Sequence, residues 1–401
     1  MPSNRPGGPP TRPRALAALV LVALAAAASC SSTSSSSSSS SSPKVPDSLP
    51  AAPATNQNSA FSGNGPYAAG VTYETTPQGD PVVVYYPVSP SATKGRTTYS
   101  INLARWLLGS PTATIPAAFQ GLPTTLATTA YAGLTAAAGT FPVVLFSHGY
   151  GGYPEQSSFL TDHLATWGFV VVAPDHRSRD LAAELAGKTQ DCFPTCDVTD
   201  LENALALART LDGTKGGFLD GRLDLTRVAS LGHSAGGGAA IAVAAADADV
   251  RTYIGLAPAS GPVPTSAKPG MIVQGGADTV VKPTESETLY GTLPTPKRLI
   301  LIEETGHNVF DDACVIGAAQ GGLTAFIGKL GLQADFVKIA TDGCSAPDIS
   351  PPVAWPLIDQ AVTAQLRFGL GIDPQPVGLG PTLGTNFPGV TALVTATPPT
   401  S

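Results

Sequence analysis

The hydrophobic positions of this chain fall into short apolar runs that alternate with longer segments of helical spacing. Apolar runs such as Phe-Pro-Val-Val-Leu-Phe predict buried strands at 67–73, 81–86, 141–146, 169–174, 253–256, 271–274 and 299–302, and another that starts at residue 226. Apolar residues at helical spacing predict helices at 154–167, 197–211, 235–246, 285–290 and 355–368. This alternation indicates an α/β fold with a mostly parallel sheet and helices on both faces.

Residues 1–64 do not follow this pattern and carry the features of a targeting segment. Residues 1–14 hold three arginines and no acidic residue, and residues 15–28 form a continuous apolar run. That run has the length of a signal-peptide core and is short for a membrane span. It ends just before Ser29-Cys30, so it resembles a bacterial lipoprotein signal in which Cys30 becomes the lipidated N-terminus. An ordinary secretory signal, cut after a small residue, is the alternative.

A Ser-rich segment separates this signal from the rest of the chain. Its composition buries too little apolar area to fold. We therefore divide the chain into a signal peptide at 1–29, a disordered tether at 30–64, an α/β domain at 65–370 and a loose Pro/Gly/Thr-rich tail at 371–401. Residues 89–140 are an excursion of the domain that we expect to lie over its functional site.

The charge balance limits the partners of the domain. The net charge is −7 over 401 residues, and no run of lysine or arginine is present. Loss of the three signal arginines takes the net charge from −7 to −10. We therefore expect no nucleic-acid partner. We expect an exported monomer that a lipid on Cys30 anchors to a bacterial membrane, with secretion as the alternative.

The central motif is Gly232-His233-Ser234-Ala235-Gly236, which matches G-x-S-x-G. It lies between a predicted strand and a predicted helix, where a serine occupies a strained turn with its hydroxyl above the sheet edge. The two glycines let the strand and the helix approach closely. The N-terminus of the helix offers free N–H groups to an oxyanion. The alternative is a Gly-rich turn with an idle serine.

A serine nucleophile needs a base, and the chain has five histidines. In enzymes with this motif the order along the chain is nucleophile, acid, histidine. Only His307 follows Ser234, and it lies on a loop after the strand predicted at 299–302. His307 is therefore the predicted base, and His176, which follows another strand, is the rival.

A carboxylate must orient the base and stabilise its protonated form. Asp278 follows the strand predicted at 271–274 through Gly-Gly-Ala, so it also lies on a loop at a strand end. Parallel sheets carry their sites at the carboxyl ends of their strands. Asp278 is therefore the predicted acid, and Glu304 is the alternative.

Two backbone N–H groups are the expected oxyanion donors. One belongs to Ala235, the residue after the nucleophile. The other belongs to the His-Gly-Tyr-Gly-Gly loop at 148–152, which resembles the H-G-x-G loops of esterases. We predict that the second donor is the N–H of Tyr150.

These motifs together resemble the α/β-hydrolase superfamily over residues 65–370. The resemblance rests on the segments 146–152, 169–176, 232–237, 276–278 and 306–307. Within the superfamily the chain is most similar to the secreted dienelactone-hydrolase-like group, close to the platelet-activating-factor acetylhydrolase and polyester-hydrolase branches. The resemblance implies hydrolysis of a small-molecule or lipid carboxylic ester through an acyl-serine, with no cofactor and no metal. A lipase or polyester hydrolase, and a non-catalytic surface lipoprotein on a hydrolase scaffold, are the alternatives.

Four cysteines follow Cys30 in the chain. An exported protein favours disulfides, and four cysteines allow three pairings. We favour Cys192–Cys196, which would close a small loop, and Cys314–Cys344, which would pin the segment after His307. A zinc site formed by all four thiolates is the alternative.

Overall fold

The computed structural model describes residues 49–51, 59–115, 125–318 and 334–398. The signal segment, Cys30 and most of the Ser-rich tether lie outside these residues. Within these ranges, no helix is both long enough and apolar enough to cross a bilayer.

The centre of the described domain is a ten-stranded sheet with the order β12-β11-β10-β9-β8-β6-β7-β2-β1-β5. Neighbours from β7 to β11 run parallel, whereas β7 with β2, β2 with β1, and β11 with β12 run antiparallel. The strands are β1 (Ala68–Thr75), β2 (Pro81–Val88), β5 (Tyr131–Ala132), β6 (Phe141–Ser147), β7 (Val170–Pro174), β8 (Leu223–His233), β9 (Val250–Leu256), β10 (Gly270–Gly275), β11 (Lys297–Ile302) and β12 (Ala392–Thr397).

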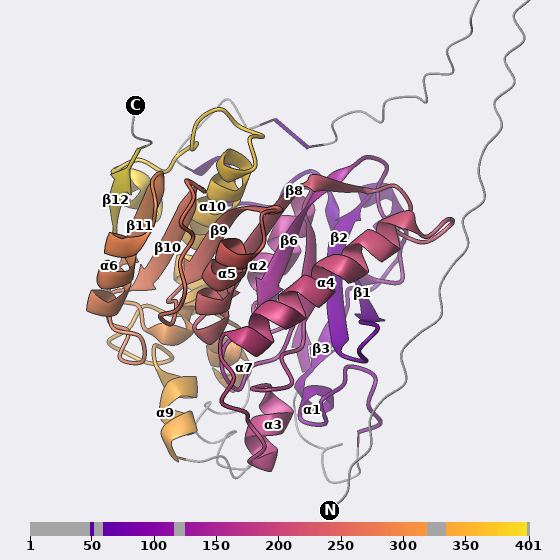
Figure 1. Cartoon of the computed structure of the whole chain (residues 1–401), viewed down its shortest axis with the longest axis horizontal. Helices are drawn as coiled ribbons and strands as arrows, with labels where there is room; N and C mark the ends of the chain where they lie inside the picture. The colour runs from indigo at the N-terminus through magenta and orange to yellow at the C-terminus, as the bar shows by residue number, and fades with distance from the viewer. Residues whose placement is uncertain (1–48, 52–58, 116–124, 319–333, 399–401) are drawn as a thin grey trace, which may run out of the picture. The chain divides into compact units, whose positions relative to one another are not determined.

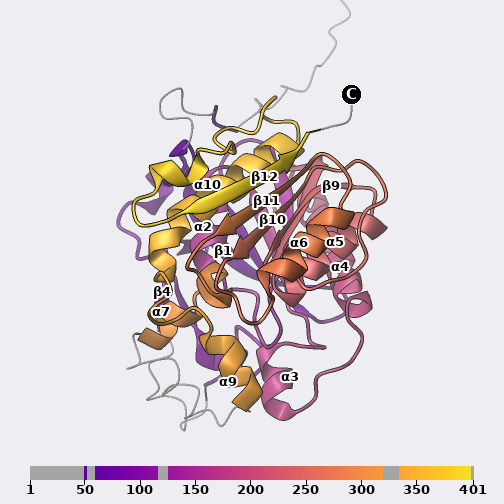
Figure 2. The ribbon, with the colours of Figure 1, turned by 90° about the vertical axis from the view of Figure 1, so that its left-hand side faces the viewer.

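Helices cover both faces of this sheet, as Figure 2 shows along its edge. One face carries α2 (Ser158–Thr166) and α10 (Pro351–Gly369). The other face carries α4 (Thr195–Gly213), α5 (Ala235–Ala246) and α6 (Pro283–Thr292). The sequence therefore predicted the fold class correctly.

Each face of the sheet has its own hydrophobic core. The neighbouring β6 residues Leu145 and Phe146 are both fully buried, and they belong to opposite cores. A strand that is buried on both faces has few polar positions, so it reads as a continuous apolar run. This explains why the central strands could be recognised in the sequence.

Shorter elements surround the carboxyl ends of the central strands or extend from the sheet (Figure 1). They are η2 (Pro90–Thr93), β3 (Ser100–Asn102), α1 (Leu103–Trp106), β4 (Thr125–Ala127), α3 (Leu181–Ala186), η4 (His307–Phe310), α7 (Ala313–Ala318), α9 (Ala334–Thr341) and η5 (Leu383–Asn386). The described part of the excursion at 89–140 contributes η2, β3, α1, β4 and β5. The indole Nε1–H of Trp106 in α1 donates to Oε2 of Glu155 over 2.6 Å, which fixes α1 beside the start of α2.

Two expectations about the ends of the domain are wrong. Packing begins before residue 65, because Phe61 is fully buried and its N–H donates to Oε1 of Gln360 over 2.7 Å. The tail is not loose where the structure describes it, because β12 pairs with β11 along its whole length. This pairing satisfies backbone groups that an apolar edge strand would otherwise leave open.

Candidate active site

The turn that carries Ser234 joins β8 to α5. Ser234 has φ 59° and ψ −123°, a strained conformation for a residue other than glycine. Both flanking glycines are required by close contacts. A Cβ at Gly232 would lie 2.2 Å from the carbonyl oxygen of Gly236, and a Cβ at Gly236 would lie 2.1 Å from that of Ser147. The turn therefore has the geometry that the motif predicted.

Gly236→Ala is expected to destabilise the protein by about 1–3 kcal/mol or more, because the new methyl group would overlap backbone atoms. The clashing atoms are the carbonyl oxygens of Ser147 and His148, at 2.1 and 2.2 Å. Urea denaturation measures the effect. Gly291→Ala in α6 is the matched control, since no atom lies within 4 Å of its Cβ position, and it should be neutral or slightly stabilising. Equal losses of stability in the two variants would contradict the steric explanation.

Three predicted side chains meet at this turn. Nε2 of His307 lies 2.9 Å from Oγ of Ser234, and its Nδ1 lies 2.8 Å from Oδ2 of Asp278. Asp278 and His307 expose 3% and 1% of their surface. This is the spacing of a nucleophile, a base and an orienting acid.

The carboxylate of Asp278 is itself held by several donors. Its Oδ1 accepts the N–H groups of Val280 and Val281, both over 2.8 Å. Its Oδ2 accepts from Nε2 of Gln274 over 3.1 Å as well as from His307. Glu304, the alternative acid, lies on the loop before His307. Its backbone has a φ of 54°, in the left-handed region.

The rival base His176 belongs to a separate buried network. Its Nε2 lies 2.8 Å from Oγ of Ser147, and its Nδ1 lies 2.9 Å from Oδ2 of Asp200. Burial, the positive charge of Arg179 and the neighbouring ring of His148 lower the pKa of His176 well below its usual value. The structure therefore pairs His307, and not His176, with Ser234.

A carboxylate that the sequence did not indicate joins the loops of Asp278 and His307. Oδ1 of Asp342 accepts the N–H of His307 over 2.6 Å, and its Oδ2 accepts the N–H of Thr279 over 3.2 Å. Asp342 lies two residues before Cys344, which forms a disulfide with Cys314. The disulfide thus closes the segment that holds the base, as the sequence suggested.

Both predicted cysteine pairings are present. Cys192 bonds Cys196, and Cys314 bonds Cys344. A zinc site formed by the four thiolates is therefore ruled out, because disulfide sulfurs have no thiolate to offer.

The loop between β6 and α2 lies against the nucleophile. A Cβ at Gly149 would lie 3.4 Å from Cβ of Ser234. The N–H groups of Tyr150 and Ala235 donate to no acceptor within the described part of the chain, so both are free to bind an oxyanion.

Arg179 holds this loop in place through hydrogen bonds to its backbone. Its Nη1 donates to the carbonyl oxygens of His148 and Gly149, both over 2.7 Å, and its own carbonyl accepts the N–H of Gly151 over 2.8 Å. Its Nε donates to the buried carboxylate of Asp197. No sequence motif indicated Arg179, whose role depends on contacts between separate loops.

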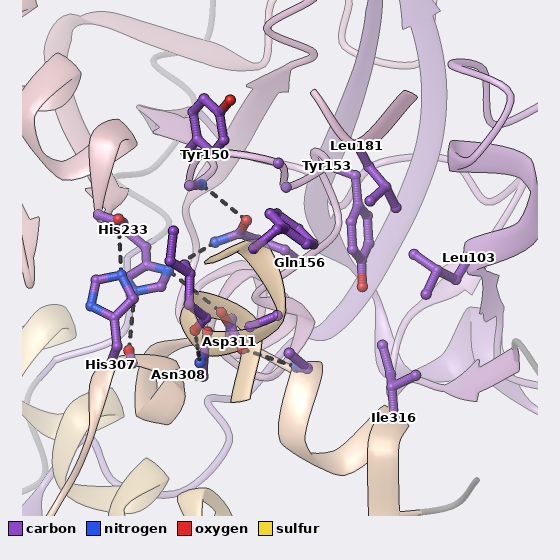
Figure 3. A pocket seen from close by; sticks show the side chains of 18 residues that line it. Leu103, Tyr150, Tyr153, Gln156, Leu181, His233, His307, Asn308, Asp311 and Ile316 are labelled. Carbon is purple, nitrogen blue, oxygen red and sulfur yellow. Dashed lines mark hydrogen bonds and ion pairs between the residues drawn. The ribbon is translucent and has the colours of Figure 1, made fainter. Parts of the chain in front are cut away.

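Ser234 and His307 line a pocket of about 100 Å³. Figure 3 shows the side chains that line it. Its walls are mainly apolar and come from α1, the loop at 148–153, α3, α7 and α9. The main apolar side chains are those of Leu103, Tyr153, Leu181, Ile316, Phe336 and Ile339. One carboxyl group, Asp311, also lines it, and burial raises the pKa of Asp311 well above its usual value. The pocket therefore suits an apolar substituent next to the serine hydroxyl.

Comparison with known proteins gives two family matches. A family model described as PET hydrolase-like matches residues 126–321, and one described as platelet-activating factor acetylhydrolase, isoform II, matches residues 53–192. Both matched ranges include the loop that lies against Ser234. The first range also includes Ser234, Asp278 and His307.

Similar curated proteins are cutinases of the genus Thermobifida. Cutinase est2 of Thermobifida alba is 27% identical over 183 residues, which are 43% of this chain and 53% of that protein. Cutinase 2 of Thermobifida cellulosilytica is 28% identical over 188 residues, 43% of this chain and 61% of that protein. Cutinase cut1 of Thermobifida fusca is 28% identical over 188 residues, 43% of this chain and 50% of that protein. The chain thus spans 50–61% of the length of these relatives.

The sheet order and the comparisons lead to the same assignment. The sheet is parallel at its centre, and the strained serine turn follows one of its central strands. The described domain therefore has the α/β-hydrolase fold.

Proposed function

We propose that this protein is a serine hydrolase that cleaves carboxylic esters through an acyl-serine intermediate. The observation that carries the proposal is the hydrogen-bonded chain Ser234–His307–Asp278 at the base of an apolar pocket. The family matches to ester hydrolases and the cutinase relatives support the same reaction class.

The proposed first step forms the acyl-enzyme. Oγ of Ser234 attacks the ester carbonyl carbon while Nε2 of His307 takes the hydroxyl proton. Asp278 keeps the imidazole in the tautomer that accepts this proton and stabilises the imidazolium that results. The N–H groups of Tyr150 and Ala235 bind the oxyanion. The tetrahedral intermediate then collapses, and His307 gives the proton to the departing alkoxide.

The second step returns the free enzyme. Water takes the place of the alcohol, and His307 removes a proton from it as it attacks the acyl carbon. The new intermediate collapses to a carboxylic acid, and Oγ of Ser234 regains its proton from His307. Apart from the attacking water, the proposed reaction uses only side chains and backbone groups of this chain, so it requires no cofactor.

A fluorophosphonate probe tests the proposal. We expect one covalent adduct per chain, which peptide mass mapping should place on Ser234, and we expect turnover of a short-chain p-nitrophenyl ester. Absence of both labelling and turnover would favour the alternative of a non-catalytic surface protein on a hydrolase scaffold.

The PET hydrolase-like model and the cutinase relatives favour a second candidate, a lipase or polyester hydrolase that acts on longer or polymeric esters. A series of p-nitrophenyl esters of increasing acyl length distinguishes the candidates. Activity that rises with chain length, or at an interface, favours the second candidate.

We also propose that the protein is exported and held at a bacterial membrane by a lipid on Cys30. The proposal rests on the arginine-rich start, the apolar run and the cysteine that follows it. Partition of the full chain into detergent, lost in Cys30→Ser, would support it, and equal partition of both forms would contradict it. We further propose that the protein acts as a monomer on a small-molecule or lipid ester.

A further inference from the structure

A line of three hydrogen bonds runs along the wall of the pocket and joins the loop after β6, the end of β8 and the start of η4 (Figure 3). The N–H of Gly149 donates to Oε1 of Gln156 over 2.9 Å. Nε2 of Gln156 lies 3.1 Å from Nδ1 of His233, and Nε2 of His233 lies 3.1 Å from the carbonyl oxygen of His307. We refer to Gln156 and His233 as the relay.

The direction of every bond in the relay follows from its two ends. The backbone N–H of Gly149 can only donate, so Gln156 must present its oxygen there and its NH₂ group to His233. Nδ1 of His233 is therefore an acceptor, and the ring proton is on Nε2. That proton is donated to the carbonyl of His307, which can only accept. Burial and the nearby His307 lower the pKa of His233 well below its usual value, which agrees with a neutral ring.

The relay is rigidly held. Gln156 and His233 expose 5% and 2% of their surface. The N–H of Gln156 donates to the carbonyl of Tyr153 over 3.0 Å, and its own carbonyl accepts the N–H of Asp312 over 2.7 Å. A Cβ at Gly152 would lie 2.1 Å from Oε1 of Gln156, so a glycine there makes room for the side chain. Buried amides and imidazoles with defined partners lose little freedom when substrate binds.

Each contact of the relay adjoins a reacting group. Gly149 precedes Tyr150, the proposed oxyanion donor. His233 precedes Ser234, the proposed nucleophile, and the last acceptor is the backbone of His307, the proposed base. We propose that Gln156 and His233 are positioning residues that set the distances between the oxyanion donor, the nucleophile and the base. This inference rests on the proposed function.

The size of the effect follows from the sensitivity of catalysis to geometry. A displacement of about 1 Å in a reacting group costs on the order of 100-fold in rate. We therefore expect Gln156→Met, which keeps the volume but removes both polar contacts, to lower kcat by about 10–100-fold with KM changed by less than about 2-fold.

Gln360→Met is the matched control. Gln360 is also fully buried, and it also joins two segments through a backbone N–H, that of Phe61 at 2.7 Å, and a backbone carbonyl, that of Val377 at 3.0 Å. It lies on α10 and is not one of the residues that line the pocket, so its loss should lower the melting temperature and leave kcat unchanged. Equal values of kcat in Gln156→Met and Gln360→Met would overturn the proposal.

Gln156→Glu provides a readout that a purely structural role would not move. A carboxylate at position 156 can still accept from Gly149, but it cannot donate to His233. A protonated carboxyl group restores that donor, and burial raises the pKa of such a group. Asp311, whose Oδ2 lies 3.6 Å from Nδ1 of His233, and His307, whose ring lies 4.6 Å from that of His233, are present in both proteins, so a ratio of rates isolates the group at position 156. The ratio of kcat in Gln156→Glu to kcat in the wild type should therefore rise as the pH falls. A ratio that is constant with pH would overturn the relay.

NMR spectroscopy tests the relay without reference to activity. The ¹⁵N shifts of His233 should report a neutral ring with its proton on Nε2 in the wild type, and Gln156→Met should shift the amide signals of Gly149 and Tyr150. Another tautomer, or unshifted amides, would overturn the relay. A wild type that shows this tautomer but hydrolyses no ester would overturn the proposed function alone.

Discussion

Ser234→Ala is expected to lower kcat for ester hydrolysis on the order of 10⁶-fold, the loss seen when the nucleophile of a serine hydrolase is removed. Without Oγ no acyl-enzyme can form. The oxyanion donors and the pocket would still support a residual rate above that of water. Initial rates with a short-chain p-nitrophenyl ester, measured on purified protein, give the value.

The control for this variant is Ser230→Ala. Ser230 lies on the same strand, is fully buried, and donates to the carbonyl of Ala240 over 2.6 Å. The substitution removes one buried hydrogen bond but no group that takes part in the proposed reaction, so kcat should be unchanged. If Ser234→Ala retained more than a tenth of the wild-type rate, another residue would have to be the nucleophile.

Asp278→Asn is expected to lower kcat on the order of 10⁴-fold, because it reverses the tautomer of the base. The amide oxygen of the new residue can keep the bonds from Val280 and Val281. Its NH₂ group would then face Nδ1 of His307, which must accept, so the ring proton moves to Nε2. A protonated Nε2 cannot take the proton of Ser234.

The pH profile of this variant distinguishes a tautomer effect from a loss of folding. We expect a melting temperature close to that of the wild type and a rate that climbs with hydroxide concentration at high pH. Asp373→Asn, which removes a remote ion pair with Arg367 at 2.7 Å, should keep full activity. A rate for Asp278→Asn within tenfold of the wild type would argue that another group orients His307.

The sequence was sufficient for the central sheet and for the three residues that meet at its edge. Strands that are buried on both faces have few polar positions, so β6, β7 and β10 could be recognised without other information. Ser234, Asp278 and His307 each follow such a strand. Because parallel strands end at the same edge, their convergence in space could be expected from the order of elements alone.

The relay, and the contacts of Arg179 with the loop at 148–152, could not be predicted in the same way. Gln156 is 77 residues from His233, and Arg179 is 31 residues from His148, so no local pattern connects them. Their roles depend on which loops face each other above the sheet. Asp342 was missed for the same reason, since its partner His307 lies 35 residues away.

Composition misled the prediction of the C-terminal segment. Proline and glycine are frequent there, and β12 is a short edge strand with several exposed positions, so its period is weak. The pairing of β12 is decided by the open edge of β11 and not by its own propensity. Leu383 and Phe387, which precede β12, are buried and so fix the chain near that edge.

Shortening the chain at residue 370 would therefore do more than remove an appendage. It would uncover the backbone N–H and C=O groups along β11, which now bond to β12 from Lys297 to Ile302. An open, apolar strand edge is a template on which other chains can add strands. Expression of the isolated domain would favour aggregation, and boundaries chosen for crystallisation should retain β12.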